Sequence, residues 1–257
     1  MKSWIIVIGN EILIGRVLDT NSNWIAKKLT ELGIKVERIL VIPDEEETIV
    51  DVLKEACRHA DIIISTGGLG PTYDDITSEA LAKALNQKWV VNKEALNMVK
   101  QRLKRLNLEL NEYRIKMAKM PEKAKPLENK VGVAPGIYVE YNNIKIFALP
   151  GVPSEMKHIY LNHVEKILKR IFKRKYYRED KIRVKGYTES TLAPILNKIV
   201  TKYPDVYVKS HPLGVVDGKP VIDIVVASYG NDEGTLKNKN ITIINEIRKR
   251  LDESKKT

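Results

Sequence analysis

The sequence has few of the residues that mark secreted, metal-clustered or membrane-spanning proteins. Cysteine occurs once among 257 residues, so no internal disulfide can form. The four histidines are scattered, without the close helical spacing of a zinc protease. No apolar run approaches the roughly 20 residues that span a bilayer, and the amino terminus lacks the apolar stretch and cleavage site of a signal peptide. These absences predict a cytoplasmic protein with no membrane partner.

The composition is that of a globular protein with an excess of positive charge. Hydrophobic residues make up 43% and charged residues 30% of the chain, whose length suits one large domain or a medium and a small one. The net charge of +11 is compatible with binding to nucleic acid, although a solvated helix end and linker would explain it as well. Much of the excess lies in one stretch that contains Lys166, Lys169, Arg170, Lys173, Arg174, Lys175, Arg178, Lys181, Arg183 and Lys185. Nucleic-acid binding is therefore not the favoured hypothesis.

Residues 65 to 77 form the most informative segment, Ser-Thr-Gly-Gly-Leu-Gly-Pro-Thr-Tyr-Asp-Asp-Ile-Thr. It follows a short β-branched run, Ala60–Ser65, and precedes a run with helical spacing, Thr77–Asn86. A glycine-rich loop between a strand and a helix presents backbone N–H groups and the positive end of the helix dipole, and it lets a ligand approach closely. The segment therefore predicts a phosphate-binding site.

Asp74 and Asp75 add negative charge to this predicted phosphate site. Two carboxylates would repel a phosphate by several kcal/mol at low effective dielectric. A divalent cation resolves the conflict, because it takes carboxylate and phosphate oxygens together. The structural alternative is that Asp75 or Thr77 only N-caps the next helix and the glycines only make a turn. We favour a functional interpretation of the whole segment, whereas Asp75 taken alone fits both.

The first part of the chain alternates between strands and helices. The expected order is strand Trp4–Ile8, helix Asn21–Leu32, strand Ile34–Ile42, helix Asp44–His59 and strand Ile62–Ser65. Such units make right-handed crossovers, so we expect an α/β domain with helices on both faces of a mostly parallel sheet. Ligands bind beyond the carboxyl ends of such strands, where the loops at Gly9, Asp44 and Gly67 fall. Asp44 also has the spacing of a capping box with Glu47.

The remainder of the first domain mixes helices with a hairpin. The expected elements are helices over Lys93–Leu106 and Asn111–Met120, an irregular segment Pro121–Val131, strands Gly136–Glu140 and Ile144–Leu149, and a helix opened by Leu149–Met156. Proline is expected at the start of that last helix. Ser154 beside it suits an N-cap or a substrate contact equally.

A second, smaller domain follows the basic stretch. We place the boundary between residues 172 and 173, which gives domains of 1–172 and 173–257. The pattern predicts a β-α-β-β-α unit with strand 182–186, helix 191–200, strands 206–210 and 221–228, and helix 242–251. Prolines and glycines fall in the connections, as turn residues should.

Three ordered blocks between about residue 4 and residue 170 carry a resemblance to a known family. They are Gly9–Gly15 followed by Asp19-Thr20-Asn21, then Thr66–Thr77, then Leu149–Met156. The blocks resemble the amino-terminal part of CinA, the competence/damage-inducible protein A, which belongs to the molybdopterin-binding superfamily of MoaB and MogA. The small second domain is similar to the KH-like piece found next in CinA-type proteins.

The resemblance implies a nucleotide-processing fold and, for CinA-type domains, a metal-dependent ADP-ribose pyrophosphatase that gives AMP and ribose 5-phosphate. Asp75 matches the loop aspartate of the superfamily and Asp44 the aspartate after the second strand, both implicated there in catalysis or metal binding. Asn10 departs from the pattern, because the molybdopterin enzymes tend to have aspartate there. Longer relatives carry an amidohydrolase domain that this chain does not reach, so deamidase activity is not predicted.

These inferences together predict a metal-assisted diphosphate site. The predicted catalytic residues are Asp44, Asp75 and Glu11, the last to orient or deprotonate water. Asp44, Asp74 and Asp75 are the predicted ligands of a divalent metal such as Mg, Mn or Co, with K+ as a further candidate. The predicted binding residues for a small-molecule nucleotide or pterin are Gly9, Asn10, Gly15, Asn21, Thr66, Gly67, Gly68, Gly70, Pro71, Thr72, Gly151 and Ser154.

Two alternatives keep the same fold. One is molybdopterin binding or adenylyl transfer, as in the superfamily relatives. The other is a nucleic-acid-binding protein that acts through its basic linker and small domain, although the Gly-x-x-Gly backbone clamp of KH domains is missing there.

The resemblance also bears on assembly. Relatives form oligomers, so we expect a homodimer by analogy.

Overall fold

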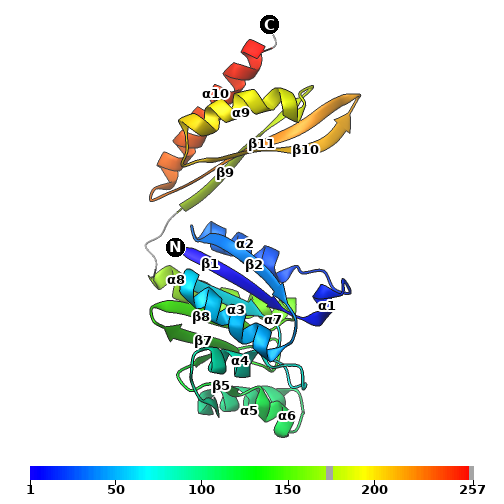
Figure 1. The fold of residues 1–257 in the computed structure, drawn as a ribbon, viewed down its shortest axis with the longest axis vertical. Coiled ribbons are helices and arrows are strands. Elements are labelled where there is room, and N and C mark those ends of the chain that lie inside the picture. Colours follow the sequence, from blue (N-terminus) through cyan, green and yellow to red (C-terminus); the bar gives the residue numbers. More distant parts are fainter. Residues whose placement is uncertain (172–175, 255–257) are drawn as a thin grey trace. The chain divides into compact units, whose positions relative to one another are not determined.

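The computed structural model describes residues 1–171 and 176–254, and the chain divides into two compact units close to residue 172 (Figure 1). The first unit contains a six-stranded and a two-stranded sheet, the second unit contains a three-stranded sheet, and no strand is shared between the units. Within the described residues, no helix combines the length and the apolar character that a bilayer crossing requires.

The first unit is built on a six-stranded sheet of mostly parallel strands. In spatial order these are β2 (Lys35–Ile42), β1 (Lys2–Ile8), β3 (Ile62–Thr66), β8 (Ile144–Leu149), β7 (Gly136–Tyr141) and β6 (Lys125–Leu127). The first four run parallel, and β7 and β6 add an antiparallel edge. The predicted mostly parallel sheet is confirmed, as is the predicted hairpin of β7 and β8.

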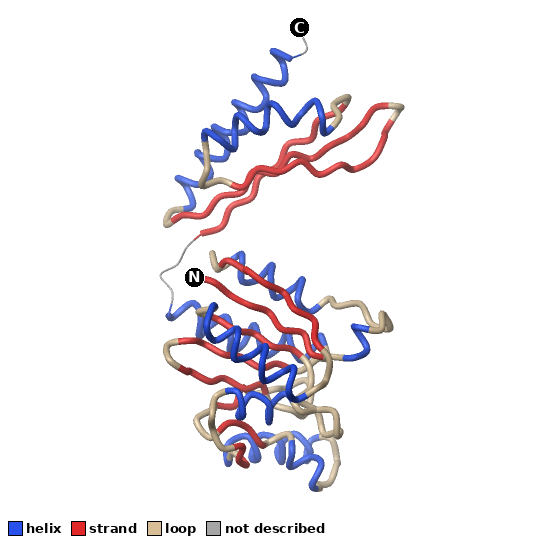
Figure 2. The backbone as a smooth tube through the Cα atoms, in the orientation of Figure 1, coloured by secondary structure: helices blue, strands red, loops and turns tan. Residues whose placement is uncertain are grey.

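Helices cover both faces of this sheet (Figure 2). The helices of this unit are α1 (Asn10–Leu13), α2 (Asn21–Glu31), α3 (Glu46–His59), α4 (Thr77–Ala84), α5 (Lys93–Arg105), α6 (Glu112–Lys116), α7 (Pro153–Ile159) and α8 (Glu165–Ile171), with a π-helical turn, η1 (Tyr160–Val164), between the last two. A small antiparallel pair, β4 (Trp89–Val91) and β5 (Lys119–Pro121), lies beside α4.

Burial of β1 on both faces explains the three layers. Trp4 and Ile6 pack in one core with Ile49 and Leu53 of α3. Ile5 points to the opposite face, because successive side chains of a strand alternate, and it is fully buried as well. A strand that buries both of its faces needs a helical layer on each side.

Two segments differ from the sequence prediction. The helix expected over residues 111–120 ends at Lys116, and Lys119–Pro121 pairs instead with β4. Met120 is fully buried in the main core through this pairing. The segment expected to be irregular contains β6. Both short strands owe their structure to pairing with another strand, β5 with β4 and β6 with β7, and helical periodicity does not report such pairing.

The second unit has the predicted β-α-β-β-α order. Its elements are β9 (Tyr176–Lys185), α9 (Glu189–Lys202), β10 (Tyr207–Val216), β11 (Lys219–Gly230) and α10 (Glu233–Ser254). The sheet is antiparallel in the order β10-β11-β9, and both helices pack on one of its faces (Figure 1). Both helices and all three strands are longer than predicted. Because β9 already begins at Tyr176, the prediction of a linker is wrong from that residue onward. Lys173, Arg174 and Lys175 of the basic stretch lie outside the described residues.

Glu246 of α10 ties the two helices of this unit together. Its Oε2 accepts hydrogen bonds from Nζ of Lys202 at 2.8 Å and from the hydroxyl of Tyr203 at 3.0 Å, and its Oε1 accepts from Arg250 at 2.9 Å. These bonds, that of Lys202 first, lower the pKa of Glu246 to about 2. A carboxyl group whose pKa is lowered by folding stabilises the fold above its unfolded pKa and loses this effect as the pH falls.

We therefore expect Glu246→Gln to lower the stability of the second unit by about 1 kcal/mol at neutral pH. Thermal melting of both proteins from pH 7 down to pH 2 checks this. The difference should be constant above the unfolded pKa near 4.5 and shrink as the pH falls toward 2. A difference that stays the same across this range would show that the charge of Glu246 is not its source.

Candidate functional site

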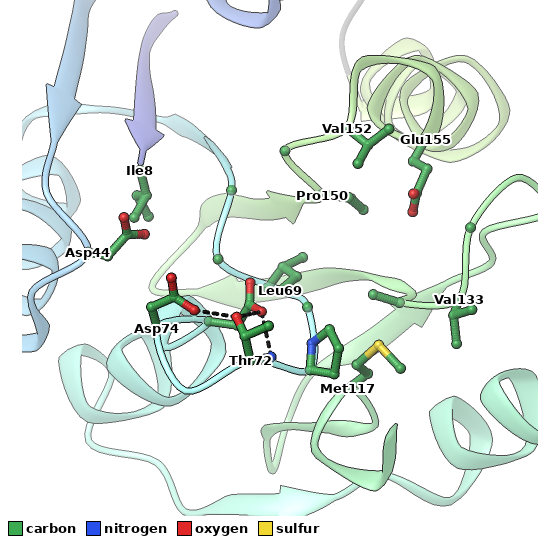
Figure 3. Close-up of a pocket in the computed structure, with 18 of the residues that line it drawn as sticks. Ile8, Asp44, Leu69, Thr72, Asp74, Met117, Val133, Pro150, Val152 and Glu155 are labelled. Carbon is green, nitrogen blue, oxygen red and sulfur yellow. Dashed lines mark hydrogen bonds between the residues drawn. The ribbon is translucent and has the colours of Figure 1, made fainter. Parts of the chain in front are cut away.

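A cleft of about 680 Å³ opens beyond the carboxyl ends of β1, β2, β3 and β8 (Figure 3). The loops after all four strands contribute to it, as expected for a parallel sheet. From these loops it is lined by Ile8, Glu11, Asp44, Gly67, Gly68, Leu69, Gly70, Pro71, Thr72, Asp74, Asp75, Pro150, Gly151, Val152 and Glu155. The cleft therefore brings together all of the predicted catalytic and metal-binding carboxylates and most of the predicted glycine-rich loop.

The glycine-rich loop is anchored at its first residue. The N–H of Gly67 donates to the carbonyl of Leu149 at 3.0 Å, and the hydroxyl of Thr77 donates to the carbonyl of Gly67 at 2.9 Å. Gly67 has φ +108°, and a Cβ at this position would overlap the carbonyl oxygen of Ile8. Only glycine lets the loop pass this close to the end of β1.

The loop offers fewer free N–H groups than the sequence predicts. Among the loop residues predicted to bind the ligand, Gly67 donates its N–H to the carbonyl of Leu149, and Thr72 donates its N–H to Oδ2 of Asp75 at 2.8 Å. This corrects the prediction for those two groups, because the folded chain already supplies their acceptors. The N–H groups of Gly68 and Gly70 have no acceptor among the described residues, and both residues line the cleft.

Asp75 shapes the loop from within. Its Oδ2 accepts from both the N–H and the hydroxyl of Thr72, and that hydroxyl also contacts Asp74. Lys116 of α6 donates to the carbonyl of Thr72 and holds the same turn from outside. The capping alternative is wrong for both Asp75 and Thr77, because α4 has Ile76 at its N-cap position and no side-chain cap.

Asp44 lies near Asp74, on the side of the cleft opposite Met117 and Val133 (Figure 3). Its Oδ2 accepts the N–H of Asn10 at 2.8 Å, so the predicted capping box with Glu47 is wrong and α3 begins at Glu46 instead. Burial raises the pKa of Asp44 above its ordinary value, and the charges of Glu11, Asp74 and Asp75 raise it further. These carboxylates form an acidic end of the cleft whose charges repel one another.

The acidic end suits a cation shared with a ligand better than a cation held by protein alone. No group of three or more His, Cys, Asp or Glu side chains in residues 1–171 and 176–254 is close enough to enclose a metal. Mg2+ is commonly held by one or two carboxylates together with substrate phosphates and water. One or two of Asp44, Asp74 and Asp75 would suffice for that kind of binding, and a cation there would also offset the negative charge that, after burial, raises the pKa of Asp44.

Several predicted binding residues support the cleft without lining it. The side-chain amide of Asn21 donates to the hydroxyl of Thr66 at 3.1 Å and to the carbonyl of Gly151 at 2.7 Å. The hydroxyl of Thr66 donates in turn to the carbonyl of Pro150 at 3.0 Å. These bonds join the ends of β3 and β8. The cleft is likewise not lined by Gly9, Asn10, Gly15 or Ser154. Ser154 lies in the first turn of α7 and does not cap that helix.

The sequence did not indicate the wall opposite the carboxylates. Leu108, Arg114 and Met117 come from the region around α6, and Gly132, Val133 and Ala134 from the loop before β7. Glu155 accepts from the side-chain amide of Asn129 at 2.6 Å and lies against Gly132. In Figure 3, Met117, Val133 and Glu155 face Asp44 and Asp74 across the glycine-rich loop. Only Glu155 belongs to a block that the sequence singled out.

Gly67→Ala should lower the stability of the first unit by about 1–3 kcal/mol, because the new methyl group meets the backbone of Ile8 in a left-handed conformation. Gly15→Ala is the matched control, since Gly15 also has positive φ but nothing lies within 4 Å of the position of its Cβ. It should cost about 1 kcal/mol. Urea unfolding of both variants measures the difference, and equal losses would contradict the close approach.

Comparisons with known proteins agree with this architecture. A family model described as a probable molybdopterin binding domain matches residues 4–170. A protein of Caldivirga maquilingensis is 48% identical over 234 residues, 91% of this chain and 90% of that protein. A protein of Sulfurisphaera tokodaii is 46% identical over 252 residues, 96% of this chain and 95% of that protein.

The crystal structure of the protein CinA with unknown function from Thermoplasma acidophilum is 39% identical in sequence, with a TM-score of 0.62. The match covers 65% of this chain and 99% of that one. The chain therefore belongs to the molybdopterin-binding domain family, and within it to the CinA-like proteins.

Proposed function

We propose that the first unit hydrolyses the diphosphate bond of a nucleotide, with ADP-ribose as the substrate and AMP and ribose 5-phosphate as the products. The observation that carries this proposal is the meeting of the glycine-rich loop with the four carboxylates of Glu11, Asp44, Asp74 and Asp75 at one end of the cleft, with Glu155 on the opposite side. A diphosphate bridged by a cation would suit both, because its oxygens accept from N–H groups and its cation binds carboxylate oxygens.

The glycine-rich loop and the carboxylates of the acidic end have separate roles in this proposed reaction. The N–H groups of Gly68 and Gly70 would bind phosphate oxygens, and one or two of the carboxylates of Asp44, Asp74 and Asp75 would hold a divalent cation such as Mg2+, Mn2+ or Co2+, with K+ as a further candidate. A bound divalent cation supplies Lewis acidity at phosphorus and offsets charge that grows in the transition state. Glu11 accepts the proton of the water that attacks phosphorus, and the P–O bond of the bridging oxygen breaks.

The wall opposite the carboxylates suits the nucleobase. Leu69, Met117, Val133 and Val152 present apolar groups to the cleft, and Arg114 adds a cationic side chain beside them. Ligand pockets typically pair such an apolar surface with a few polar groups that set orientation. A nucleotide would place its ring system on this wall and its diphosphate at the carboxylates, so both ends of the cleft would be used.

A second function is favoured by the family match. The matching model is described as a probable molybdopterin binding domain, and a pterin ring would occupy the same apolar wall. Molybdopterin binding or adenylyl transfer would therefore use this cleft without hydrolysing ADP-ribose.

One assay distinguishes the two functions. The purified chain is incubated with ADP-ribose and a panel of divalent and monovalent cations, and the products are analysed. Cation-dependent release of AMP supports hydrolysis, whereas pterin binding without this release supports the alternative.

Asp44→Asn should lower the rate of AMP release by about 100-fold, because it removes a carboxylate from the cation site. The same substitution should leave thermal stability unchanged or raise it, since Asp44 faces neighbouring negative charges in the folded protein. Asp51→Asn is the matched control, because Asp51 is an exposed carboxylate on α3 outside the cleft. Rate assays and thermal melting test the pair, and equal rates for the two variants would remove Asp44 from the mechanism.

A further inference from the structure

Within residues 176–254, both helices of the second unit pack on one face of its sheet, and no helix packs on the other face. Ile182, Ile224 and Val226 point toward α9 and α10 and form the core with them. Neighbouring residues in each strand therefore point away from both helices. Strand register places these residues in rows across the sheet: Tyr177 with Tyr229, Glu179 with Ala227 and Tyr207, Lys181 with Val225 and Lys209, and Arg183 with Asp223 and His211. We call this surface the open face.

Three tyrosines gather at one end of the open face. The rings of Tyr177 and Tyr229 lie 5.0 Å apart between centroids, tilted by 47°. Tyr207 lies in the next row, on the other side of β11 from β9. Tyr207 and Tyr229 are 52% and 44% exposed. Tyrosine rings exposed on a sheet are platforms on which planar rings can stack.

Cationic side chains continue from the tyrosines along the strands. Lys181 and Arg183 share the carboxylate of Asp223, with the guanidinium of Arg183 bound to both of its oxygens. Asp223 is buried beneath them, whereas both cationic side chains remain more than 60% exposed. Lys209 is exposed and has no anionic partner among the described residues. Glu179 also lies on this face, where its carboxylate accepts the hydroxyl of Tyr177 at 2.6 Å. The cations of Lys181, Arg183 and Lys209 therefore exceed the carboxylates of Glu179 and Asp223 by one charge.

We propose that the open face binds single-stranded nucleic acid, with bases stacked on the tyrosines and phosphates on the cationic side chains. Stacking platforms combined with a basic track are the physical basis of strand binding without sequence preference. From Tyr177 to Lys185, β9 extends about 26 Å at about 3.3 Å per residue, a length that several nucleotides of a single strand can follow. This mode needs no Gly-x-x-Gly clamp, and it is independent of the cleft in the first unit.

The chemistry of the face distinguishes a single strand from other polyanions. A duplex keeps its bases stacked inside, so it could use the cationic side chains but not the tyrosines. An acidic peptide would likewise pair with Lys209 and Arg183 and leave the aromatic rings unused. The contribution of Tyr207 to binding is therefore the measurement that decides the proposal.

Fluorescence anisotropy of the full chain with a labelled oligouridylate of about 20 nucleotides at low salt tests the proposal. Tyr207→Ala should weaken binding about tenfold, and Tyr207→Phe, which keeps the ring, should bind like the unaltered protein. Lys209→Ala should weaken binding and lower the slope of log affinity against log salt concentration by about 0.7. A duplex of the same length should bind more weakly than the single strand.

Two matched controls carry the same substitutions elsewhere. Tyr113→Ala removes a tyrosine that is 71% exposed in the first unit, and Lys198→Ala removes an exposed cation on α9, whose inner side packs on the other face of the sheet. Both should bind within about twofold of the unaltered protein. Thermal melting checks that all variants fold. The proposal is overturned if the unaltered protein does not bind, if Tyr207→Ala binds as well as Tyr207→Phe, or if the controls lose as much affinity.

Discussion

The close approach of the Gly67 backbone to the end of β1 is the constraint on which the cleft depends. At this point β3 delivers the glycine-rich loop between the carbonyl of Ile8 and the carbonyl of Leu149, and Thr77 fastens it from the start of α4. The loop therefore has one course across the sheet edge. Because of that course, the carboxylates of Asp74 and Asp75 lie within electrostatic reach of Asp44.

The same geometry concentrates charge of one sign. Asp44 is held by the backbone of Asn10, and Asp75 by Thr72, so neither carboxylate can turn away from the cleft without losing a hydrogen bond. Negative charges gathered in this way oppose folding in the first unit. A cation shared with a phosphorylated ligand would offset them, as the proposed function requires. In the second unit, by contrast, cationic side chains gather over the single buried carboxylate of Asp223.

Individual residues show how far the sequence prediction reached within the site. The segment from Thr66 to Asp75 was placed correctly at the carboxyl edge of the sheet, because a β-branched run and a helical run flank it. The roles of Asn21 and Thr66 were not visible, because their hydrogen bonds join β3 to a loop more than eighty residues further along the chain. The N–H groups of Gly67 and Thr72 were predicted to be free, yet the folded chain supplies acceptors for both.

The sequence by itself determined the order of strands and helices, the parallel sheet and the edge at which the cleft lies, because these follow from hydrophobic periodicity and from the glycine-rich turn. It also determined which carboxylates stand at that edge. Only the tertiary structure decided what faces them: α6, the loop before β7 and Glu155 reach the cleft through packing between distant segments. The open face of the second sheet was decided in the same way, since strand register alone brings Tyr177, Tyr207 and Tyr229 together. Local patterns encode which face of an element is buried, whereas the neighbours of the exposed face depend on how the whole chain folds.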